Sequence, residues 1–324
     1  MPIIFERFCV IWFSIEKNYD IFNYICAKFI TGERKVENNQ VTILGARGSI
    51  PVSGAGYTIY GGATSCVLLE AETASGADAL PTSHAVVFDA GSGFLNLPQR
   101  VWKEHAKVHV FLSHFHLDHL MGIPMSPMLY DPSAEVIFYA KDGDKIPEVF
   151  RQMMAEPLWP VGPDSFRAKL SYRSIGMQPV LLDADEERTA GDRDHSLVIT
   201  AFPVTHPGGA LAFRADWGAH SMVYATDCDP DEGTGRLLEC FAADTELFIL
   251  DAQYTDEEYE QCRGFGHPGM RTSAQIIASS GAGRGLFFHH APAHTDAQLS
   301  EMEQRLQQYR KNISYAREGD VIAL

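Results

Sequence analysis

The ten residues 113–122 read Ser-His-Phe-His-Leu-Asp-His-Leu-Met-Gly. They place three imidazoles and one carboxylate within six positions, in the pattern His-x-His-x-Asp-His. The apolar run 108–112 before them predicts a buried strand. If the chain stays extended beyond that strand, His114 and His116 project to the same side. The carboxylate and the third imidazole would follow where a helix begins. Donors of these types converging from one loop are what a divalent metal such as zinc requires, and two adjacent metals would explain why there are four.

A loop of surface histidines is the simple alternative to a metal site. The whole chain holds 13 histidines in 324 residues. Four metal-type donors within six positions are therefore far denser than the composition alone would give. The sequence predicts a metal site at this loop.

This pattern resembles the first ligand motif of the metallo-β-lactamase fold hydrolases, and the resemblance extends over residues 41–324. In that family the motif supplies half of a two-metal centre, and three later single residues supply the rest. The resemblance implies a four-layer αββα sandwich, in which two mixed β-sheets are flanked by helices. It favours the phosphodiesterase branch that includes ribonuclease Z. Repeated strand, turn and helix signals independently favour α/β layering.

Each later donor follows an apolar run that predicts a strand, at the sheet edge where α/β proteins place their sites. These donors are His206 after the run 197–202, Asp227 after the run 222–226 and His289 after the run 286–288. The family order implies that one metal is held by His114, His116, His206 and Asp227. It implies that the other metal is held by Asp118, His119, His289 and the shared Asp227.

Several neighbours of these donors are assigned by the same resemblance. His289 is preferred to His290 as the ligand because its distance from Pro292 matches the family's His-x-x-Pro. His290 and His294 are expected to contact the substrate. Asp89, at the end of the run 85–89, resembles the carboxylate that braces the metal-binding loop, and the glycine-containing loop 46–54 is expected beneath the metal site. Cys228, next to Asp227 in the chain, is expected to be a thiol of the core or one that supports the ligands, rather than a ligand itself.

Asp118 and His267 are the expected catalytic residues. His267 lies in a Gly-His-Pro sequence that resembles the Gly-His-Ser of ribonuclease Z, whose histidine protonates the leaving group. The chain departs from that pattern at Pro268, where serine is usual. It also carries Asp-Ala-Gln at 251–253, where ribonuclease Z carries His-Glu. These departures put the transfer of the proton relay in doubt.

The expected cofactors are two divalent metal ions, zinc in the first place, with manganese or iron as alternatives because the sites contain carboxylates. Two ions bridged by a carboxylate lower the pKa of a shared water from about 15.7 towards about 7. The resulting bridging hydroxide attacks phosphorus or a carbonyl, while the metals stabilise the developing charge. No side-chain nucleophile is needed.

Substrate size is limited by two features of the sequence. The 26 Lys and Arg residues against 42 Asp and Glu residues give a net charge of −16, whereas proteins that grip long nucleic acids usually carry a basic face. His206 and Asp227 lie only 21 positions apart, which leaves room for two strands and a turn but not for the arm with which ribonuclease Z holds tRNA. Long nucleic acid is therefore disfavoured as a substrate.

The sequence thus predicts a phosphodiesterase that acts on a small substrate of the cyclic nucleotide or cyclic phosphate class. A hydrolase of carboxylic esters, lactones or thioesters on the same metals is the alternative. A tRNA 3′-processing endonuclease and a non-catalytic metal-binding module rank below both. Zinc β-lactamases carry cysteine where Asp227 stands, and oxygen-reducing diiron relatives carry glutamate where His116 stands, so neither activity is expected.

Residues 1–40 form a predicted N-terminal extension, amphipathic and of unknown role, ahead of a hydrolase domain at 41–324. Charged residues interrupt every apolar run in the extension, so no membrane span is predicted there. The 6 cysteines are scattered without a Cys-x-x-Cys pair, which indicates a reducing compartment and a cytoplasmic location. The oligomeric state stays open between a monomer and a homodimer, the commonest closed assembly.

Local patterns predict further elements between the motifs. A helix is expected around 95–105, a strand at 135–140 and a helix at 146–154. The rest of the segment 121–181 has few clear signals and three prolines between 157 and 163. Irregular segments of this kind often form the wall of a pocket, and substrate choice is expected to reside there.

Overall fold

Residues 39–73, 81–182 and 196–324 are described by the computed structural model. All of them belong to one compact unit, Asn38–Leu324. Residues 1–38 of the predicted extension lie outside the described residues, so its role stays a prediction. Among the described helices, none combines the length and the apolar character needed to cross a bilayer.

The first sheet contains seven strands in the described part of the chain. Its central strands are buried along most of their length, as expected when both faces of a sheet are covered. Pairing is antiparallel at one side of the sheet and parallel from β3 to β6. In spatial order the strands are β14 (Val321–Ala323), β1 (Gln40–Gly45), β2 (Cys66–Thr73), β3 (Thr82–Phe88), β4 (Val108–Phe111), β5 (Glu135–Ala140) and β6 (Lys169–Ser174).

The second sheet repeats this design with seven described strands. Strands β7 to β10 pair antiparallel, and β10 to β13 pair parallel. The sheet is therefore mixed, like the first. In spatial order its strands are β13 (Ile313–Tyr315), β12 (Arg284–Phe288), β11 (Leu247–Asp251), β10 (His220–Ala225), β9 (Ala210–Trp217), β8 (Leu197–Val204) and β7 (Val180–Leu182).

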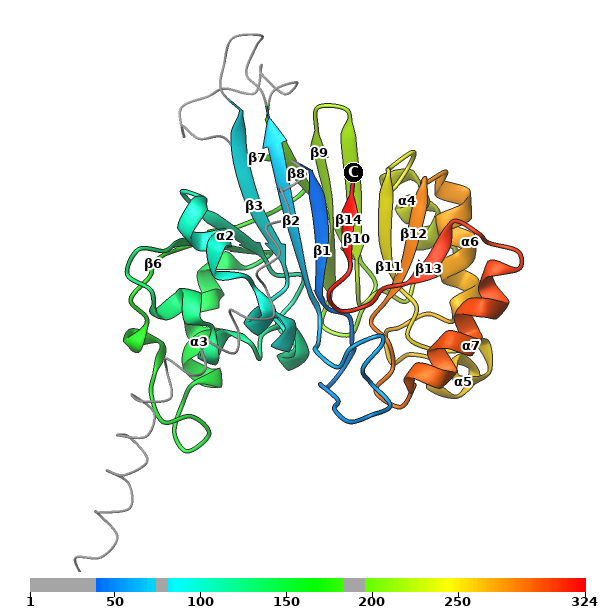
Figure 1. Ribbon diagram of the computed structural model, residues 1–324, viewed down its shortest axis with the longest axis horizontal. Helices are drawn as coiled ribbons and strands as arrows, with labels where there is room; N and C mark the ends of the chain where they lie inside the picture. The colour runs from blue at the N-terminus through cyan, green and yellow to red at the C-terminus, as the bar shows by residue number, and fades with distance from the viewer. Residues whose placement is uncertain (1–38, 74–80, 183–195) are drawn as a thin grey trace, which may run out of the picture. The chain divides into compact units, whose positions relative to one another are not determined.

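Helices cover the outer face of each sheet (Figure 1). On the side of the first sheet lie α2 (Gln99–Glu104) and α3 (Ile146–Met153); on the side of the second lie α4 (Glu232–Phe241), α5 (Asp256–Cys262), α6 (Met270–Ser280) and α7 (Asp296–Gln307). Both α5 and α7 begin with a capping box, Thr255 with Glu258 and Thr295 with Gln298, which satisfies backbone N–H groups at the helix start.

Three apolar clusters hold these layers together. One cluster lies between the sheets and includes Phe88 and Phe213, whose rings stack at 5.8 Å. A second lies under α2 and α3, around Phe138 and Phe150. The third lies under the helices of the second sheet, around Phe248. Three cores separate four layers, and the predicted αββα sandwich is confirmed.

The expected helix around 95–105 is wrong as a single element. Two short helices occupy this region, the 3-10 helix η1 (Ser92–Asn96) and α2, and Pro98 stands between them at the N-cap of α2. A proline disfavours helical backbone at the residue before it, which explains the break. The strand at 135–140 and the helix beginning at Ile146 are confirmed.

The segment 121–181 is more regular than its sequence indicates. It contributes β6, β7 and four 3-10 helices, η3 (Ile123–Met125), η4 (Pro127–Tyr130), η5 (Gly143–Lys145) and η6 (Pro163–Ser165). Strand β6 lies at the edge of its sheet and its residues are partly or fully exposed. An edge strand of this kind lacks the apolar alternation by which strands are recognised.

The stability of this fold is expected to depend on pH through His109. This side chain is buried in β4, its Nδ1 lies 3.1 Å from the Tyr139 hydroxyl, and burial lowers its pKa to about 3. An unfolded histidine has a pKa of about 6.5. The unfolded chain therefore binds the proton more tightly, and the stabilising effect of a neutral His109 is present above about pH 6.5 and lost as pH falls towards 3.

Urea unfolding of the wild type and of His109→Gln should reveal this dependence. Between pH 7.5 and pH 4.5 the wild type should lose about 2 to 3 kcal/mol more unfolding free energy than the variant, because the glutamine side chain at this position does not titrate. A difference in unfolding free energy that does not change with pH would contradict the role given to His109.

Candidate metal centre

The seven residues predicted to ligate metal come together beyond the ends of strands from both sheets. Each lies just beyond a strand end, as the sequence predicts. His114 and His116 follow β4, and the 3-10 helix η2 (Leu117–His119) carries Asp118 and His119. The other three, His206, Asp227 and His289, follow β8, β10 and β12.

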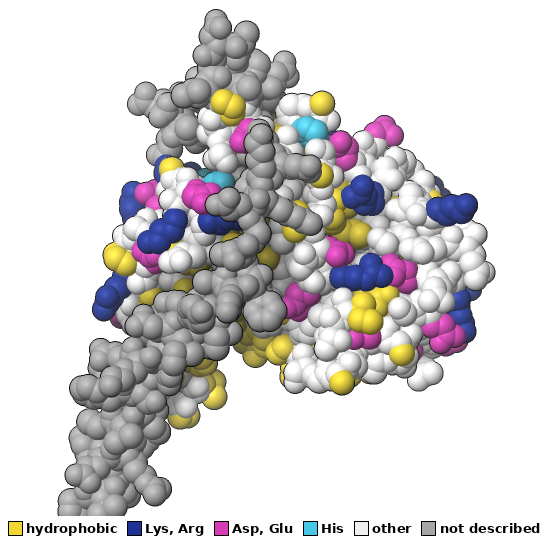
Figure 2. Space-filling view, viewed as in Figure 1, with side chains coloured by type: hydrophobic (Ala, Val, Ile, Leu, Met, Phe, Trp, Pro, Cys, Tyr) yellow, Lys and Arg dark blue, Asp and Glu magenta, His cyan; other side chains and the backbone are white. Residues whose placement is uncertain are grey.

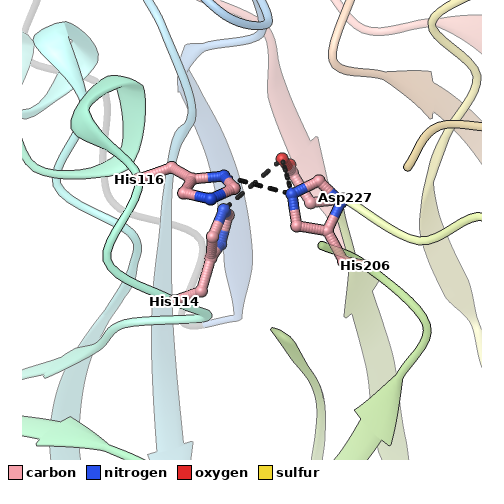
Figure 3. Close-up of side chains that lie close together, drawn as sticks. All are labelled: His114, His116, His206 and Asp227. Carbon is pink, nitrogen blue, oxygen red and sulfur yellow. Dashed lines mark hydrogen bonds and ion pairs between the residues drawn. The ribbon is translucent and has the colours of Figure 1, made fainter. Parts of the chain in front are cut away.

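The first donor set consists of His114, His116, His206 and Asp227. In Figure 3 the rings of His114 and His116 face His206 and Asp227, which come from the second sheet. His206 Nε2 lies 3.1 Å from His116 Nδ1. Asp227 Oδ2 lies 3.6 Å from His114 Nε2 and 3.5 Å from His206 Nε2. His116 is the exposed member, so this set is open to solvent on that side.

The second donor set consists of Asp118, His119, His289 and Asp227, all of them buried. Asp118 Oδ2 lies 3.3 Å from His119 Nε2 and 3.2 Å from His289 Nε2. Asp227 Oδ1 lies 3.1 Å from each of these two ring nitrogens. The two oxygens of Asp227 are therefore divided between the two sets.

These separations fit the coordination of a divalent ion. Ligand bonds of about 2.1 Å in a tetrahedral zinc site place neighbouring donor atoms about 3.4 Å apart. The contacts in both sets span 3.1 to 3.6 Å. Moreover, His114 Nε2 and His119 Nε2 are buried and make no hydrogen bond to a described residue. Both nitrogens face carboxylate oxygens at 3.1 to 3.6 Å without hydrogen-bond geometry, and buried nitrogens that lack a hydrogen bond are costly, so the donor set fits a bound cation.

The second ring nitrogen of most of these histidines is held in place, which fixes the ring and turns Nε2 toward the cluster. The partners lie 2.8 to 3.2 Å away. They are Ser113 Oγ for His114, Asp89 Oδ2 for His119, the Gly266 carbonyl for His206 and Gln253 Oε1 for His289.

Asp89 braces the histidine loop, as predicted. Its Oδ1 accepts the Ser113 backbone N–H at 2.7 Å, and its Oδ2 accepts the Ser113 and Tyr224 hydroxyls. The same Oδ2 contacts His119 Nδ1 at 2.8 Å. One buried carboxylate thus links the first sheet, the second sheet and a ligand histidine.

The backbone is strained at this edge of the sheets. Among the described residues, positive φ values at positions other than glycine occur at Ser49, Asp89, Asp227, Asp244 and His289. All but Asp244 contact the cluster. Such backbone costs about 1 kcal/mol or more per residue and persists where the surroundings enforce it, often at functional sites.

Without a metal, the carboxylates are ionised, but the pKa values of His119 and His289 are raised, so these two rings hold protons that a bound cation would displace. Burial lowers the pKa of His114 well below 6.5 and lowers that of His206, which keeps both rings neutral. Burial alone would raise the pKa of Asp227, but His119 and His289 outweigh it and hold that pKa well below 3.8. For His289, burial is outweighed by Asp227 and the other nearby carboxylates, which raise its pKa to about 9. The carboxylates are therefore ionised and supply the negative charge that a cation needs.

His267 and Asp251 form a hydrogen-bonded pair beside the cluster. His267 Nδ1 lies 2.7 Å from Asp251 Oδ2, and both residues are buried. The His267 ring stacks on His289 at 4.7 Å and lies 5.2 Å from His206. Asp251, at the position where the sequence departs from ribonuclease Z, thus provides a carboxylate to His267.

His290 and His294 lie away from the donor sets. His290 is fully buried and contacts the Ala316 carbonyl through Nε2, and burial lowers its pKa to about 3. His294 is also buried and contacts Glu258. The Nε2 atoms of both rings are therefore engaged with other parts of the fold. Cys228 lies in the core, as predicted.

Several residues that support the site have no predicted role. Ser49 donates its backbone N–H to Asp118 Oδ2 at 2.8 Å, and Gln253 orients His289. A Cβ at Gly48 would lie 2.4 Å from the His289 ring, so the loop 46–54 passes directly against this ligand. The position of 251–253 at a strand end was the available signal for Asp251 and Gln253.

Comparison with known proteins agrees with this geometry. The family model described as "Beta-lactamase superfamily domain" matches residues 84–290, more than half of the chain. The chain belongs to the β-lactamase superfamily. Within this superfamily it has the metallo-β-lactamase fold, and its relatives include hydrolases.

Individual relatives are distant. A ribonuclease Z from Haloarcula marismortui is 22% identical over 233 residues, which cover 61% of this chain and 74% of that protein. YhfI from Bacillus subtilis and a diphosphatase of the PhnP family both superpose with a TM-score of 0.59, at 20% and 17% identity. The short form of human tRNase Z superposes with a TM-score of 0.54 at 20% identity. Each of these three comparisons covers 88% of this chain and 98% of the other, and such low identity establishes the fold alone.

Replacing Asp89 by Asn should weaken metal binding without removing a ligand. The amide cannot accept hydrogen bonds at both positions, so His119 and Ser113 lose their orientation. Loss of such a partner usually lowers metal affinity about 10- to 100-fold. Competition between the protein and a chromophoric zinc chelator measures the effect. Asp131→Asn is the control, because Asp131 bonds Trp102 and Ser133 instead. Equal zinc affinity in folded wild type and Asp89→Asn would contradict the bracing role.

Proposed function

We propose that this chain is a dinuclear metal-dependent hydrolase of small phosphodiesters, of the cyclic nucleotide or cyclic phosphate class. The observation that carries the proposal is Asp227, whose two oxygens face two separate donor sets beside a histidine–aspartate pair. We propose zinc as the metal because five of the seven candidate ligands are histidines.

Two divalent ions at these donor sets would lower the pKa of a water and stabilise charge on the attacked phosphate. The side chains perform the remaining tasks. His267 is the proposed general acid: Asp251 holds its Nδ1, so its Nε2 is left to give a proton to the departing alkoxide.

Asp118 is the second residue proposed to act in catalysis as well as in ligation. Its Oδ2 accepts the Ser49 N–H, and that bond fixes the carboxylate against His119 and His289. Burial alone would raise the pKa of Asp118, but the two histidines outweigh it and keep the group ionised. An ionised carboxylate at this position can accept a hydrogen bond from the attacking water and orient it.

A small substrate is favoured by the segment between His206 and Asp227. It consists of the hairpin β9–β10 with a turn at Gly218, and it contains no inserted arm. On the face seen in Figure 2, acidic and basic side chains of the described residues are interspersed rather than separated into a basic patch. A long polyanion would find little complementary charge on that face.

We also propose a reducing, cytoplasmic setting. The four cysteines among the described residues, at positions 66, 228, 240 and 262, are all free thiols. Free thiols persist where glutathione and thioredoxin keep them reduced.

Turnover of bis-p-nitrophenyl phosphate by the zinc-loaded protein tests the proposed activity. The wild type should hydrolyse this diester faster than p-nitrophenyl acetate. Asp227→Ala should lower the rate about 10³-fold, because it removes metal stabilisation of several kcal/mol. A metal-loaded wild type that cleaves only the acetate would instead support a hydrolase of carboxylic esters.

The role of His267 has a separate test in the dependence of rate on the leaving group. His267→Gln should lower the rate by about 10² to 10⁴-fold for a 2′,3′-cyclic nucleotide, whose alkoxide needs a proton. For p-nitrophenolate, a good leaving group, the loss should be less than about tenfold. His220→Gln, far from the cluster and paired with Glu246, is the control. Equal losses on both substrates would exclude general-acid catalysis by His267.

A further inference from the structure

A cleft of about 230 Å³ opens beside the first donor set. It lies where the ends of β4 and β5 meet the turn between β8 and β9. Typical small-molecule sites measure about 300 to 1,000 Å³, so this cleft suits one functional group rather than a whole nucleotide. Its walls consist of Leu112, Ser113, His114, Phe115, His116, Ala140, Lys141, Asp142, Pro207, Gly208, Gly209, Ala210 and Leu211. We call it the lysine cleft.

Lys141 supplies the positive charge of the lysine cleft. It is exposed, and no hydrogen bond or ion pair joins its ammonium group to the described residues. The neighbouring Asp142 carboxylate forms its ion pair with Lys145 at 2.9 Å and attracts Lys141 only at longer range. In a chain of net charge −16, Lys141 is thus a cation beside the candidate metal ligands with no hydrogen bond or ion pair to the described residues.

The opposite wall leaves room for a group that Lys141 could bind. Gly208 and Gly209 have φ values of +84° and +81°, a backbone that favours glycine. A Cβ at either position would meet no atom within 4 Å, so the wall is not crowded there. Phe115 and Pro207 add apolar surface. The cleft therefore combines the Lys141 ammonium group with a short apolar lining.

His114 and His116 belong both to the first donor set and to the lysine cleft. A substrate whose scissile group lies at the metal centre can therefore extend a neighbouring group into the cleft without crossing another part of the chain. A lysine ammonium binds phosphate or carboxylate as a point charge.

We propose that the lysine cleft binds a second anionic group of the substrate, a phosphate or carboxylate that is not cleaved, through Lys141. This assignment rests on the proposed hydrolase function and narrows its substrate to small diesters with an additional negative charge. Because the contact is present before and during the reaction, it lowers KM and leaves kcat unchanged.

Matched p-nitrophenyl phosphodiesters test the proposal in the zinc-loaded full chain. Their second ester group is methyl, 2-carboxyethyl or 2-phosphonoethyl, so carboxylate and phosphate-type charges are separate arms. The wild type should show a KM about tenfold lower for one or both charged diesters than for the methyl diester, since hydrogen bonds to charged groups exceed neutral ones. The preference should weaken as ionic strength rises. The arm with the larger preference identifies the anion.

Lys141→Gln should abolish this KM preference with kcat unchanged, and Lys141→Glu should reverse it. Lys311→Gln is the matched control, because Lys311 is also exposed but lies between α7 and β13, away from the cleft. A wild type that cleaves the methyl and charged diesters with equal KM would overturn the proposal and leave the proposed function standing. The same would follow if Lys141→Gln and Lys311→Gln kept the same preference.

Two carboxylic esters, one neutral and one charged, test the anion site independently of the proposed phosphodiesterase activity. If no phosphodiester is cleaved, p-nitrophenyl acetate and mono-p-nitrophenyl succinate repeat the comparison on carbonyl chemistry. A preference for the succinate that depends on Lys141 would then support the anion site although the phosphodiesterase activity had failed. Absence of turnover in both series would overturn both.

Discussion

The arrangement of this site depends on one buried carboxylate, Asp227, which has two oxygens and two sets of partners. Oδ1 faces His119 and His289, and Oδ2 faces His114 and His206. Removing its charge would leave Asp118 as the remaining carboxylate facing the buried His119 and His289, and a buried charge that is not fully compensated is costly. The donors come from both sheets, so their convergence depends on the register of the sandwich. The metal centre and the fold therefore constrain each other.

At the strand ends, the backbone of the site has a conformation that is unfavourable for the residues found there. Asp89, Asp227 and His289 each follow a strand and each have positive φ, which L-residues with a Cβ seldom adopt. The hydrogen bonds of Asp89 and the apolar core between the sheets stabilise the fold enough to offset this strain. Rigid donors at strand ends are what a metal site with fixed geometry needs, whereas the lysine cleft adds a flexible charge at its edge.

Much of this molecule follows from sequence because its signals are local. The His-x-His-x-Asp-His motif and the apolar runs before His206, Asp227 and His289 predicted the strand ends and the side chains that come together beyond them. Contacts between distant segments were not predictable in this way. The pairing of Asp251 with His267 and the N–H bond from Ser49 to Asp118 depend on folding. The substrate contacts expected of His290 and His294 stay a prediction, and the partners of these rings, the Ala316 carbonyl and Glu258, lie far from them in the sequence.

The most direct test of the two-metal assignment is anomalous X-ray diffraction from crystals of the zinc-loaded protein. Two anomalous peaks should appear on either side of the Asp227 carboxylate, about 3.5 to 4 Å apart. One peak should lie among His114, His116 and His206, and the other among Asp118, His119 and His289. A single peak, or peaks remote from Asp227, would contradict the assignment of this carboxylate as the bridge between two metals.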